Sequence, residues 1–554
     1  MHLSPSAHVD TFTRDHLPPA RLWPEIEFTT PELRYPGQVN AATELIDVPA
    51  SRFGSDRPAL RTPDGQAWSY GQLLTRANQV AQVLTEDLAL IPGQRVLLRS
   101  PNNPWTVAAW LGVLKAGGVV VTTMAALRTA EISAIAQRAR PSIALVDHRF
   151  TADVHALGDT AAPSLTVVEY GGGSTDDLTR RAAAKSGVFA NVETAADDVA
   201  LLGPTSGSTG IPKVTMHFHR DLLSIDNTFG RHVLKLTADD LVACSAPFAF
   251  TFGLGMLIVF PLRAGSCALL TETATPLQLA EIVEREKVTV LATAPTAYRA
   301  ILREGQEGRL AGLRAAVSAG EHMPEVTWRQ LRDRLGLEVI DGIGGTEMLH
   351  IFIASAGGDI RPGSTGKPVP GYRAAILGPD GTELGAGASG RLGVIGPVGC
   401  RYLDDHRQRD YVVGGWNVTG DVFRRDEDGY FYYQARTDDM IVSSGYNIGG
   451  PEVEAAIDTH PDVLESGVVA RPDEERGSVV CAFVVLREGV AGDTAKAREI
   501  QDHVKQVLAP YKYPRDVRFR AALPRNTSGK LQRFALRELA GAEQAPARHE
   551  METS

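Results

Sequence analysis

One segment of the chain combines glycines, hydroxyl side chains and a lysine in a pattern suited to binding phosphate. It follows the apolar run 199–202 and reads TSGSTGIPK from residue 205 to residue 213. Glycines let the backbone turn tightly and point N–H groups at an anion, while hydroxyls add donors and lysine adds positive charge. The spacing is not that of a Walker loop, in which the lysine follows a glycine directly. A flexible Ser/Gly linker is the alternative, but the preceding strand and the terminal lysine disfavour it. The candidate phosphate contacts are Thr205, Ser206, Gly207, Ser208, Thr209 and Lys213.

Two more glycine-bearing loops follow short apolar runs. The run 313–317 is followed by SAGE at 318–321, and the run 337–340 by DGIGGTE at 341–347. Such runs alternate with helical patterns such as 105–115, which predicts α/β layers with much parallel sheet. Ligands of such sheets gather where loops leave the carboxyl ends of the strands. We therefore expect the three loops to share one pocket.

The length of the chain and a change in its pattern of predicted elements indicate more than one domain. A chain of 554 residues is too long for a single hydrophobic core. After the α/β region, the pattern predicts a compact α+β unit with helices near 452–457 and 495–508 and strands near 466–469, 479–485 and 517. We expect a large N-terminal α/β domain, residues 1–437, and a small mobile domain, residues 438–554. The first forty residues are expected to form an extended arm on the surface.

Composition restricts the partners and the compartment. The apolar share of 43% and charged share of 22% are those of an ordinary soluble protein, and the net charge of −10 gives no electrostatic reason to bind nucleic acid or an anionic membrane. Four widely spaced cysteines argue against a disulfide framework or a zinc cluster. No signal-peptide pattern begins the sequence, and no apolar stretch approaches the roughly 20 residues that span a bilayer. A cytoplasmic location is expected.

The chain resembles the adenylate-forming superfamily, which contains acyl-CoA synthetases, peptide-synthetase adenylation domains and beetle luciferases. The resemblance rests on the loop at 205–213, the GTE at 345–347 and the TGD at 419–421, and it extends over nearly the whole chain in the same order. It implies that Thr346 touches the α-phosphate of ATP. It also implies that Glu347 helps hold Mg²⁺, a cation that prefers carboxylate and phosphate oxygens. It assigns the walls of the adenine slot to Gly320, Glu321, Asp341 and Gly342, with Ile343 beside them. It assigns the ribose to Asp421, and a second ribose or phosphate contact to Arg436.

The same resemblance gives the C-terminal region a part in the chemistry. The turn 524–530 ends in Lys530, which is implied to reach the acid carboxylate and the α-phosphate during adenylation. Asp438 corresponds to the hinge about which the small domain rotates, and Gly445 to a position facing the thiol tunnel. The implied reaction has two steps. The acid displaces pyrophosphate from ATP, and the thiol of coenzyme A then displaces AMP.

Within the superfamily, the chain is most similar to aryl-CoA ligases of the benzoate and 2-aminobenzoate type. The similarity lies in residues 341–352 and 416–421. Two further segments, residues 6–12 and 216–221, favour the 2-aminobenzoate branch. Phenylalanine walls suit a flat ring, and the Thr251 hydroxyl could meet an ortho amino or hydroxyl group. The alternative is that Phe248, Phe250 and Thr251 are core residues. The implied acid pocket comprises Phe250, Thr251, Phe252, His219, Gly344, His350 and Ile351.

Other functions stay open at this point. A stand-alone enzyme could load its acyl group onto the phosphopantetheine of a carrier protein, because both thiols arrive on the same arm. A luciferase-like oxidation is disfavoured, because a benzoyl carbon has no α C–H. A nucleotide-binding module without catalysis is the remote alternative, and a homodimer is suggested by the family alone. The residues that argue against a non-catalytic module are Lys213, Thr346, Glu347, Asp421, Arg436 and Lys530.

Overall fold

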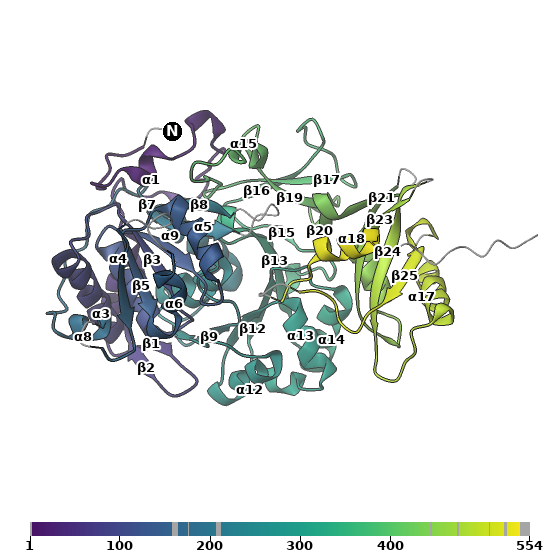
Figure 1. Ribbon diagram of the computed structural model, residues 1–554, viewed down its shortest axis with the longest axis horizontal. Coiled ribbons are helices and arrows are strands. Elements are labelled where there is room, and N and C mark those ends of the chain that lie inside the picture. Colours follow the sequence, from purple (N-terminus) through teal and green to yellow (C-terminus); the bar gives the residue numbers. More distant parts are fainter. Residues whose placement is uncertain are drawn as a thin grey trace, which may run out of the picture. The chain divides into compact units, whose positions relative to one another are not determined.

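The structure is a computed structural model (Figure 1) that describes residues 3–157, 164–174, 177–205, 212–443, 446–473, 476–508, 510–525 and 529–542. Its residues divide into two compact units. The first comprises Met1–Ala375 and Gly393–Thr419, and the second comprises Ile376–Leu392 and Gly420–Ser554. The small domain predicted from residue 438 onward falls within the second unit, and its boundary at 437/438 stays a prediction.

A six-stranded sheet forms one layer of the first unit, in the order β6-β5-β3-β4-β7-β8. All neighbours pair in parallel except β8, which runs antiparallel to β7. Every residue of β3, β4 and β5 is buried, as expected for parallel strands whose crossover helices cover the sheet. The strands are β3 (Arg95–Arg99), β4 (Val119–Thr123), β5 (Ile143–Asp147), β6 (Thr166–Tyr170), β7 (Val199–Thr205) and β8 (Lys213–Phe218).

A nine-stranded sheet forms a second layer, in the order β15-β14-β13-β12-β11-β9-β10-β1-β2. The central strands β13, β12, β11, β9, β10 and β1 pair in parallel. Strand β2 at one edge and strands β14 and β15 at the other edge pair antiparallel. Its strands are β1 (Pro58–Arg61), β2 (Ala67–Ser69), β9 (Leu241–Cys244), β10 (Cys267–Leu269), β11 (Val290–Thr293), β12 (Ala315–Ala319), β13 (Val339–Gly344), β14 (Ile351–Ala354) and β15 (Lys367–Pro368).

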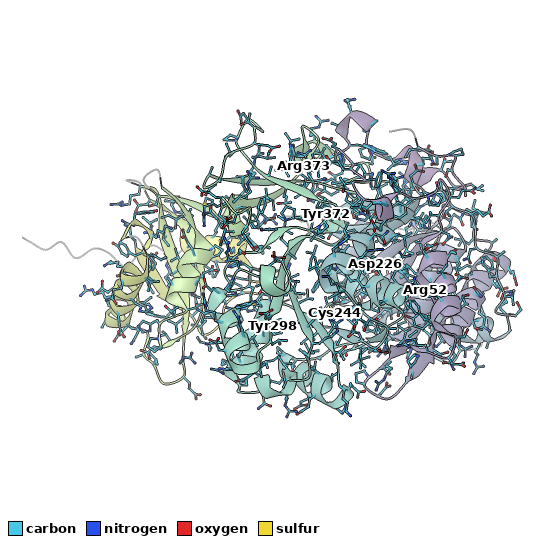
Figure 2. The ribbon with its side chains drawn as sticks, turned by 180° about the vertical axis from the view of Figure 1, so that it is seen from behind. Arg52, Asp226, Cys244, Tyr298, Tyr372 and Arg373 are labelled. Atoms are coloured by element: carbon cyan, nitrogen blue, oxygen red, sulfur yellow. The ribbon has the colours of Figure 1, made fainter. Side chains whose placement is uncertain are left out.

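Helices pack against both sheets, and their ends follow local sequence signals. At the start of α4 (Pro104–Lys115), the Asn103 side chain accepts a hydrogen bond from the backbone N–H of Thr106, and Pro104 occupies the first turn. Tyr298 of α13 is fully buried in the core of the nine-stranded sheet, as is Cys244 at the end of β9 (Figure 2). All four cysteines are buried and free. The longer helices of the first unit are α3 (Tyr70–Gln82), α4 (Pro104–Lys115), α5 (Thr129–Ala139), α9 (His219–Ile225), α12 (Pro276–Glu286), α13 (Pro295–Arg303) and α14 (Glu325–Leu335).

The N-terminal arm is fixed to the first unit by polar contacts. The backbone N–H of Ser4 donates to Asp197 at 3.1 Å, and the Ser6 hydroxyl donates to Asp198 at 2.5 Å. Asp10 pairs with Arg95 at 2.6 Å. The helical turn α1 (Phe12–Asp15) lies within this arm. The arm therefore packs on the domain through specific ion pairs and hydrogen bonds.

Three smaller sheets complete the chain. Strand β19 (Trp416–Arg425) pairs with β20 (Phe431–Arg436) beside β16 (Arg373–Leu377), β17 (Ser389–Ile395) and β18 (Val412–Val413). The C-terminal elements are the hairpin β21 (Met440–Ser443) and β22 (Tyr446–Gly449), the sheet β23 (Val463–Asp473), β24 (Gly477–Leu486) and β25 (Asp516–Phe519), and the helices α16 (Gly450–Ile457), α17 (Thr494–Val507) and α18 (Arg533–Ala542). The predicted α/β class with a small α+β C-terminal part is confirmed. Within the described residues, no helix is both long and apolar enough to cross a membrane.

Candidate active site

The predicted phosphate loop connects β7 to β8. Thr205 is the last residue of β7 and Lys213 the first of β8, and the two are opposite each other in the antiparallel pair. The Oγ1 atom of Thr205 is buried, and among the described residues it has no hydrogen-bond partner. A buried hydroxyl without a partner carries an energetic cost that a ligand can remove. The predicted contacts Ser206, Gly207, Ser208 and Thr209 lie outside the described residues.

Lys213 and Glu347 are joined through a third side chain, Tyr402. The Nζ atom of Lys213 donates to the Tyr402 hydroxyl at 2.7 Å, and this hydroxyl donates to Oε1 of Glu347 at 2.5 Å. The direct distance from Nζ to Oε1 is 3.4 Å, and the side chains of Lys213 and Glu347 are 21% and 13% exposed. The structure thus brings a predicted phosphate contact and the predicted metal ligand together at a place that a ligand can reach.

Thr346 lies beside the same two strands. It begins the 3₁₀ turn η9 (Thr346–Met348), and its carbonyl oxygen is 2.8 Å from Nε2 of His217 on β8. Because a carbonyl can only accept, the imidazole carries its proton on Nε2. Burial lowers the pKa of His217 to about 4, so the ring is neutral near pH 7. Gly203 on β7 permits this packing, since a Cβ there would lie 3.1 Å from Cγ2 of Thr346.

The residues predicted to hold adenine end two neighbouring parallel strands. Ser318 of β12 pairs with Asp341 of β13, and Gly320 follows β12 in a left-handed conformation with φ of 90°. Burial raises the pKa of Asp341 to about 8, although the backbone N–H groups of Met323 and Gly342 oppose the shift. Within the described part of the chain, its Oδ1 atom has no hydrogen-bond partner. Glu321 and Ile343 are half-buried at the same strand ends.

Aromatic side chains surround His350, a residue of the predicted acid pocket. Its ring centroid is 4.7 Å from that of Phe260, 5.2 Å from that of Phe229 and 5.7 Å from that of Phe252. Burial lowers the pKa of His350 to about 3, so the ring is neutral. Gly255 permits this packing, because a Cβ there would lie 2.4 Å from Cδ2 of the ring. His350 therefore belongs to an uncharged aromatic cluster.

Three further residues of the predicted acid pocket lie at the start of a short helix. Phe250 precedes α10 (Thr251–Leu254), and Phe250, Thr251 and Phe252 are all half-buried. Phe248 is 4% exposed and belongs to the core, which was the alternative considered for it. Half-burial of the other three suits side chains that line a binding region.

The remaining predicted acid contacts differ in their surroundings. Ile351 is buried against Gly342, and Gly344 is exposed. His219 is fully buried, and its Nδ1 atom accepts the N–H of Ala41 at 3.0 Å. Burial lowers the pKa of His219 to about 3. The hydrogen bond of His219 thus joins it to the N-terminal part of the chain and not to α10 or His350.

The second unit contains the predicted ribose residues and the predicted catalytic lysine. Asp421 and Arg436 are directly paired on β19 and β20, and their closest oxygen–nitrogen distance is 3.4 Å. Gly420, with φ of 77°, permits the Arg436 side chain to lie beside the backbone. Lys530 is exposed and precedes Leu531, which forms an antiparallel bridge with Arg525. Gly445 and the side chain of Asp438 lie outside the described residues.

Two residues of the site were not assigned a role from sequence, namely Tyr402 and His217. Tyr402 is 189 positions from Lys213, and His217 is 129 positions from Thr346. No local pattern distinguishes these two side chains from ordinary core residues. Their roles become visible only where the chain folds back on itself.

Comparison with known proteins assigns the chain to a family. The profile of the AMP-binding enzyme family matches residues 46–401, and that of the AMP-binding enzyme C-terminal domain matches residues 452–530. This chain belongs to the AMP-binding enzyme family. A benzoate–CoA ligase of Thauera aromatica is 34% identical over 519 residues, which cover 92% of this chain and 98% of the relative.

Two solved structures extend the similarity to the fold. The anthranilate CoA ligase AuaEII in complex with anthranoyl-AMP has a TM-score of 0.87 at 30% identity, over 92% of this chain and 99% of that one. ATP-bound MatB from Rhodopseudomonas palustris has a TM-score of 0.84 at 29% identity, over 91% of this chain and 99% of that one. The chain is accordingly an enzyme, an acid–thiol ligase.

The surroundings of Glu347 suit a magnesium ion that arrives with a nucleotide. Mg²⁺ is usually held by one or two carboxylates together with phosphate oxygens and water. Tyr402 fixes Oε1 of Glu347, and Oε2 lies on the side of Gly345, where a Cβ would be 3.4 Å away. One partly exposed carboxylate beside a lysine therefore fits an ion whose other ligands come from the substrate.

Proposed function

We propose that this AMP-binding enzyme is an ATP-dependent aryl-CoA ligase whose acid is an ortho-substituted benzoate, such as 2-aminobenzoate or salicylate. The observation that carries the proposal is the uncharged aromatic cluster around His350, which includes half-buried Phe252; half-buried Thr251 precedes Phe252 in the chain. Flat apolar walls favour an aromatic ring through burial and edge contacts. The names of the benzoate and anthranilate ligases support the same class of acid.

In the first half-reaction, a carboxylate oxygen of the acid bonds to the α-phosphorus of ATP, and the bond to the β-phosphate oxygen breaks to release pyrophosphate. We assign Lys213 to the phosphates, Thr346 to the α-phosphate, and Lys530 to the carboxylate and α-phosphate. Fixed positive charges in a partly buried site stabilise charge that develops in the transition state. Mg²⁺ held by Glu347 would neutralise phosphate charge. Asp421 and Arg436 are assigned to the ribose.

In the second half-reaction, the sulfur of a thiolate bonds to the acyl carbon, and AMP leaves with the oxygen of the broken acyl–phosphate bond. We propose that the small domain rotates about Asp438 between the two steps, and that Gly445 leaves room for the pantetheine arm. A few backbone dihedrals at a domain junction can absorb such a rotation. Free CoA is the proposed acceptor, and the phosphopantetheine of a carrier protein is the alternative.

The test of the proposed reaction is pyrophosphate release with MgATP over a panel of benzoates and fatty acids, with and without CoA. We expect release to be greatest with 2-aminobenzoate or salicylate and a CoA thioester to form when CoA is added. Pyrophosphate release without formation of a CoA thioester would indicate that the acyl acceptor is a carrier protein. No release with any acid would contradict the proposed function.

The ortho preference is tested separately at Thr251. Thr251→Val keeps the shape of the side chain and removes its hydroxyl. We expect kcat/KM for 2-aminobenzoate to fall about tenfold while kcat/KM for benzoate changes little, because one hydrogen bond to the substituent is lost. An equal change for both acids would mean that Thr251 does not contact the ortho group.

A further inference from the structure

Tyr402 is held rigidly beside β8. Its side chain is fully buried, and its backbone N–H donates to the side-chain oxygen of Gln408 at 2.8 Å. The backbone on either side of it bonds to β8: Met216 donates to the carbonyl of Arg401 at 2.7 Å, and Leu403 donates to that of Val214 at 2.8 Å. The phenol therefore occupies one position relative to Lys213, the first residue of the same strand.

The hydrogen bonds of this phenol have only one possible direction. An ammonium group can only donate and a carboxylate can only accept, so Tyr402 accepts from Lys213 and gives its own proton to Glu347. Burial and the nearby Glu347 carboxylate raise the pKa of Tyr402 far above its ordinary value, so the proton stays on the phenol. The Lys213 ammonium also lies 4.7 Å from the centroid of the Tyr402 ring.

The hydroxyl thus lies between two opposite charges. With the phenol in place, the Lys213 ammonium and the Glu347 carboxylate form a long direct ion pair, with 3.4 Å between Nζ and Oε1. Removal of the hydroxyl would leave both groups partly buried and without their common partner. Opposite charges in a partly buried site attract each other strongly, so the two side chains would close into a shorter and stronger ion pair. Such a pair would compete with phosphate for Lys213 and with Mg²⁺ for Glu347.

We propose that Tyr402 is a positioning residue that keeps the ion pair between Lys213 and Glu347 long, and so holds both side chains ready for MgATP. This inference rests on the proposed function, in which these two residues contact the phosphates and the metal. Residues that orient a metal ligand typically change metal affinity by roughly 10- to 100-fold when they are altered. The effect should therefore appear in binding, before any acid is present.

The experiment is calorimetric titration of MgATP into the protein without acid or CoA, in the wild type and in Tyr402→Phe. We expect the Kd for MgATP to rise about tenfold in Tyr402→Phe, with a smaller change for ATP in the presence of EDTA. Tyr70→Phe is the matched control, because Tyr70 is also fully buried and its hydroxyl donates to the backbone oxygen of Ser266 at 2.8 Å. It should bind MgATP as the wild type does.

A double-mutant comparison separates this role from general packing. In a Lys213→Met background no ion pair can form, so adding Tyr402→Phe should change the Kd for MgATP much less than it does in the wild type. An unchanged Kd in Tyr402→Phe, or the same fold-change in both backgrounds, would overturn the inference. A wild type that does not bind MgATP would overturn the proposed function and the inference with it.

A measurement on the wild type covers the case in which Tyr402→Phe does not fold. A crystal structure with MgATP should show the Tyr402 hydroxyl within hydrogen-bond distance of Glu347, with Lys213 directed to phosphate. Separation of Tyr402 from Glu347 in that complex would overturn the inference.

Discussion

His217 donates the proton on its Nε2 atom to the carbonyl oxygen of Thr346, 2.8 Å away. Lys213, four residues earlier on β8, is linked through Tyr402 to Glu347, the residue after Thr346. Residues four apart on a strand point to the same face. One face of β8 therefore fixes both residues of the Thr346–Glu347 turn, one through its backbone and the other through its carboxylate.

Loss of the His217 donor should impair positioning of this turn. His217→Leu removes one of two hydrogen bonds to the carbonyl of Thr346, whose other donor is the N–H of Leu349 at 3.2 Å, and should cost about 1 kcal/mol of stability. We expect pyrophosphate release to slow by about tenfold or more, because the turn loses its fixed position. His217→Gln retains an N–H donor and should recover most of the rate. If the two variants are equally slow, the hydrogen bond is not what positions Thr346.

The unusual carboxyl of Asp341 should make stability depend on pH. Burial raises its pKa in the folded protein to about 8, whereas an unfolded Asp has a pKa near 3.9. Between these values the folded chain binds a proton that the unfolded chain has released. The contribution of Asp341 to the free energy of unfolding therefore falls as pH rises from about 4 to about 8, by at most about 1.4 kcal/mol per pH unit.

Asp341→Asn tests this linkage, because an amide resembles the protonated acid and does not titrate. We expect the variant to gain stability relative to the wild type as pH rises from 6 to 8, measured by denaturant unfolding at each pH. Asp56→Asn, at an exposed position, is the control and should show no such trend. A difference between Asp341→Asn and wild type that is constant over pH would mean that Asp341 is ionised throughout this range.

Local pattern predicted the elements of this fold better than the contacts of its site. The helix predicted at 105–115 is α4 (Pro104–Lys115), and the strand predicted at 479–485 lies within β24 (Gly477–Leu486). These predictions succeed because the periodicity of apolar residues and the signals at element ends depend on residues close together in the sequence. The strand predicted at 313–317 is shifted by two residues, to Ala315–Ala319.

The sequence did not predict which side chains meet in the folded protein. The phosphate loop and the Thr346–Glu347 turn each have a recognisable local pattern, and the meeting of Lys213 with Glu347 agrees with the expected shared pocket. Tyr402 and His217 have no such pattern, since their partners are more than a hundred positions away. His219 was assigned to the acid by resemblance, but its hydrogen bond to Ala41 depends on packing that the resemblance does not contain.

The buried ion pair between Arg401 and Asp221 should respond differently to the loss of one partner and to the loss of both. Arg401 and Asp221 have fully buried side chains and lie 3.0 Å apart, and Asp221 also accepts the N–H of Phe218 at 2.9 Å. Arg401→Met leaves the Asp221 carboxylate buried without its cation, which should cost about 3–5 kcal/mol in denaturant unfolding. Arg401→Met combined with Asp221→Leu should cost less than Arg401→Met alone. A larger loss in the double variant would show that the two side chains do not act as a pair.

Lys530 should be required for one half-reaction only. In the proposed mechanism its ammonium stabilises charge that develops as the acid attacks the α-phosphorus, an effect of about 100- to 1,000-fold for one well-placed donor. Lys530→Ala should therefore lose acid-dependent pyrophosphate release by about that factor. It should still convert a chemically prepared aryl-adenylate and CoA to the thioester, because that step no longer involves attack at phosphorus. Lys505→Ala, at a lysine of the same unit that pairs with Asp502, is the control and should retain both activities. Equal loss of both half-reactions in Lys530→Ala would indicate a structural role for the lysine, and retention of both would remove it from the catalytic site.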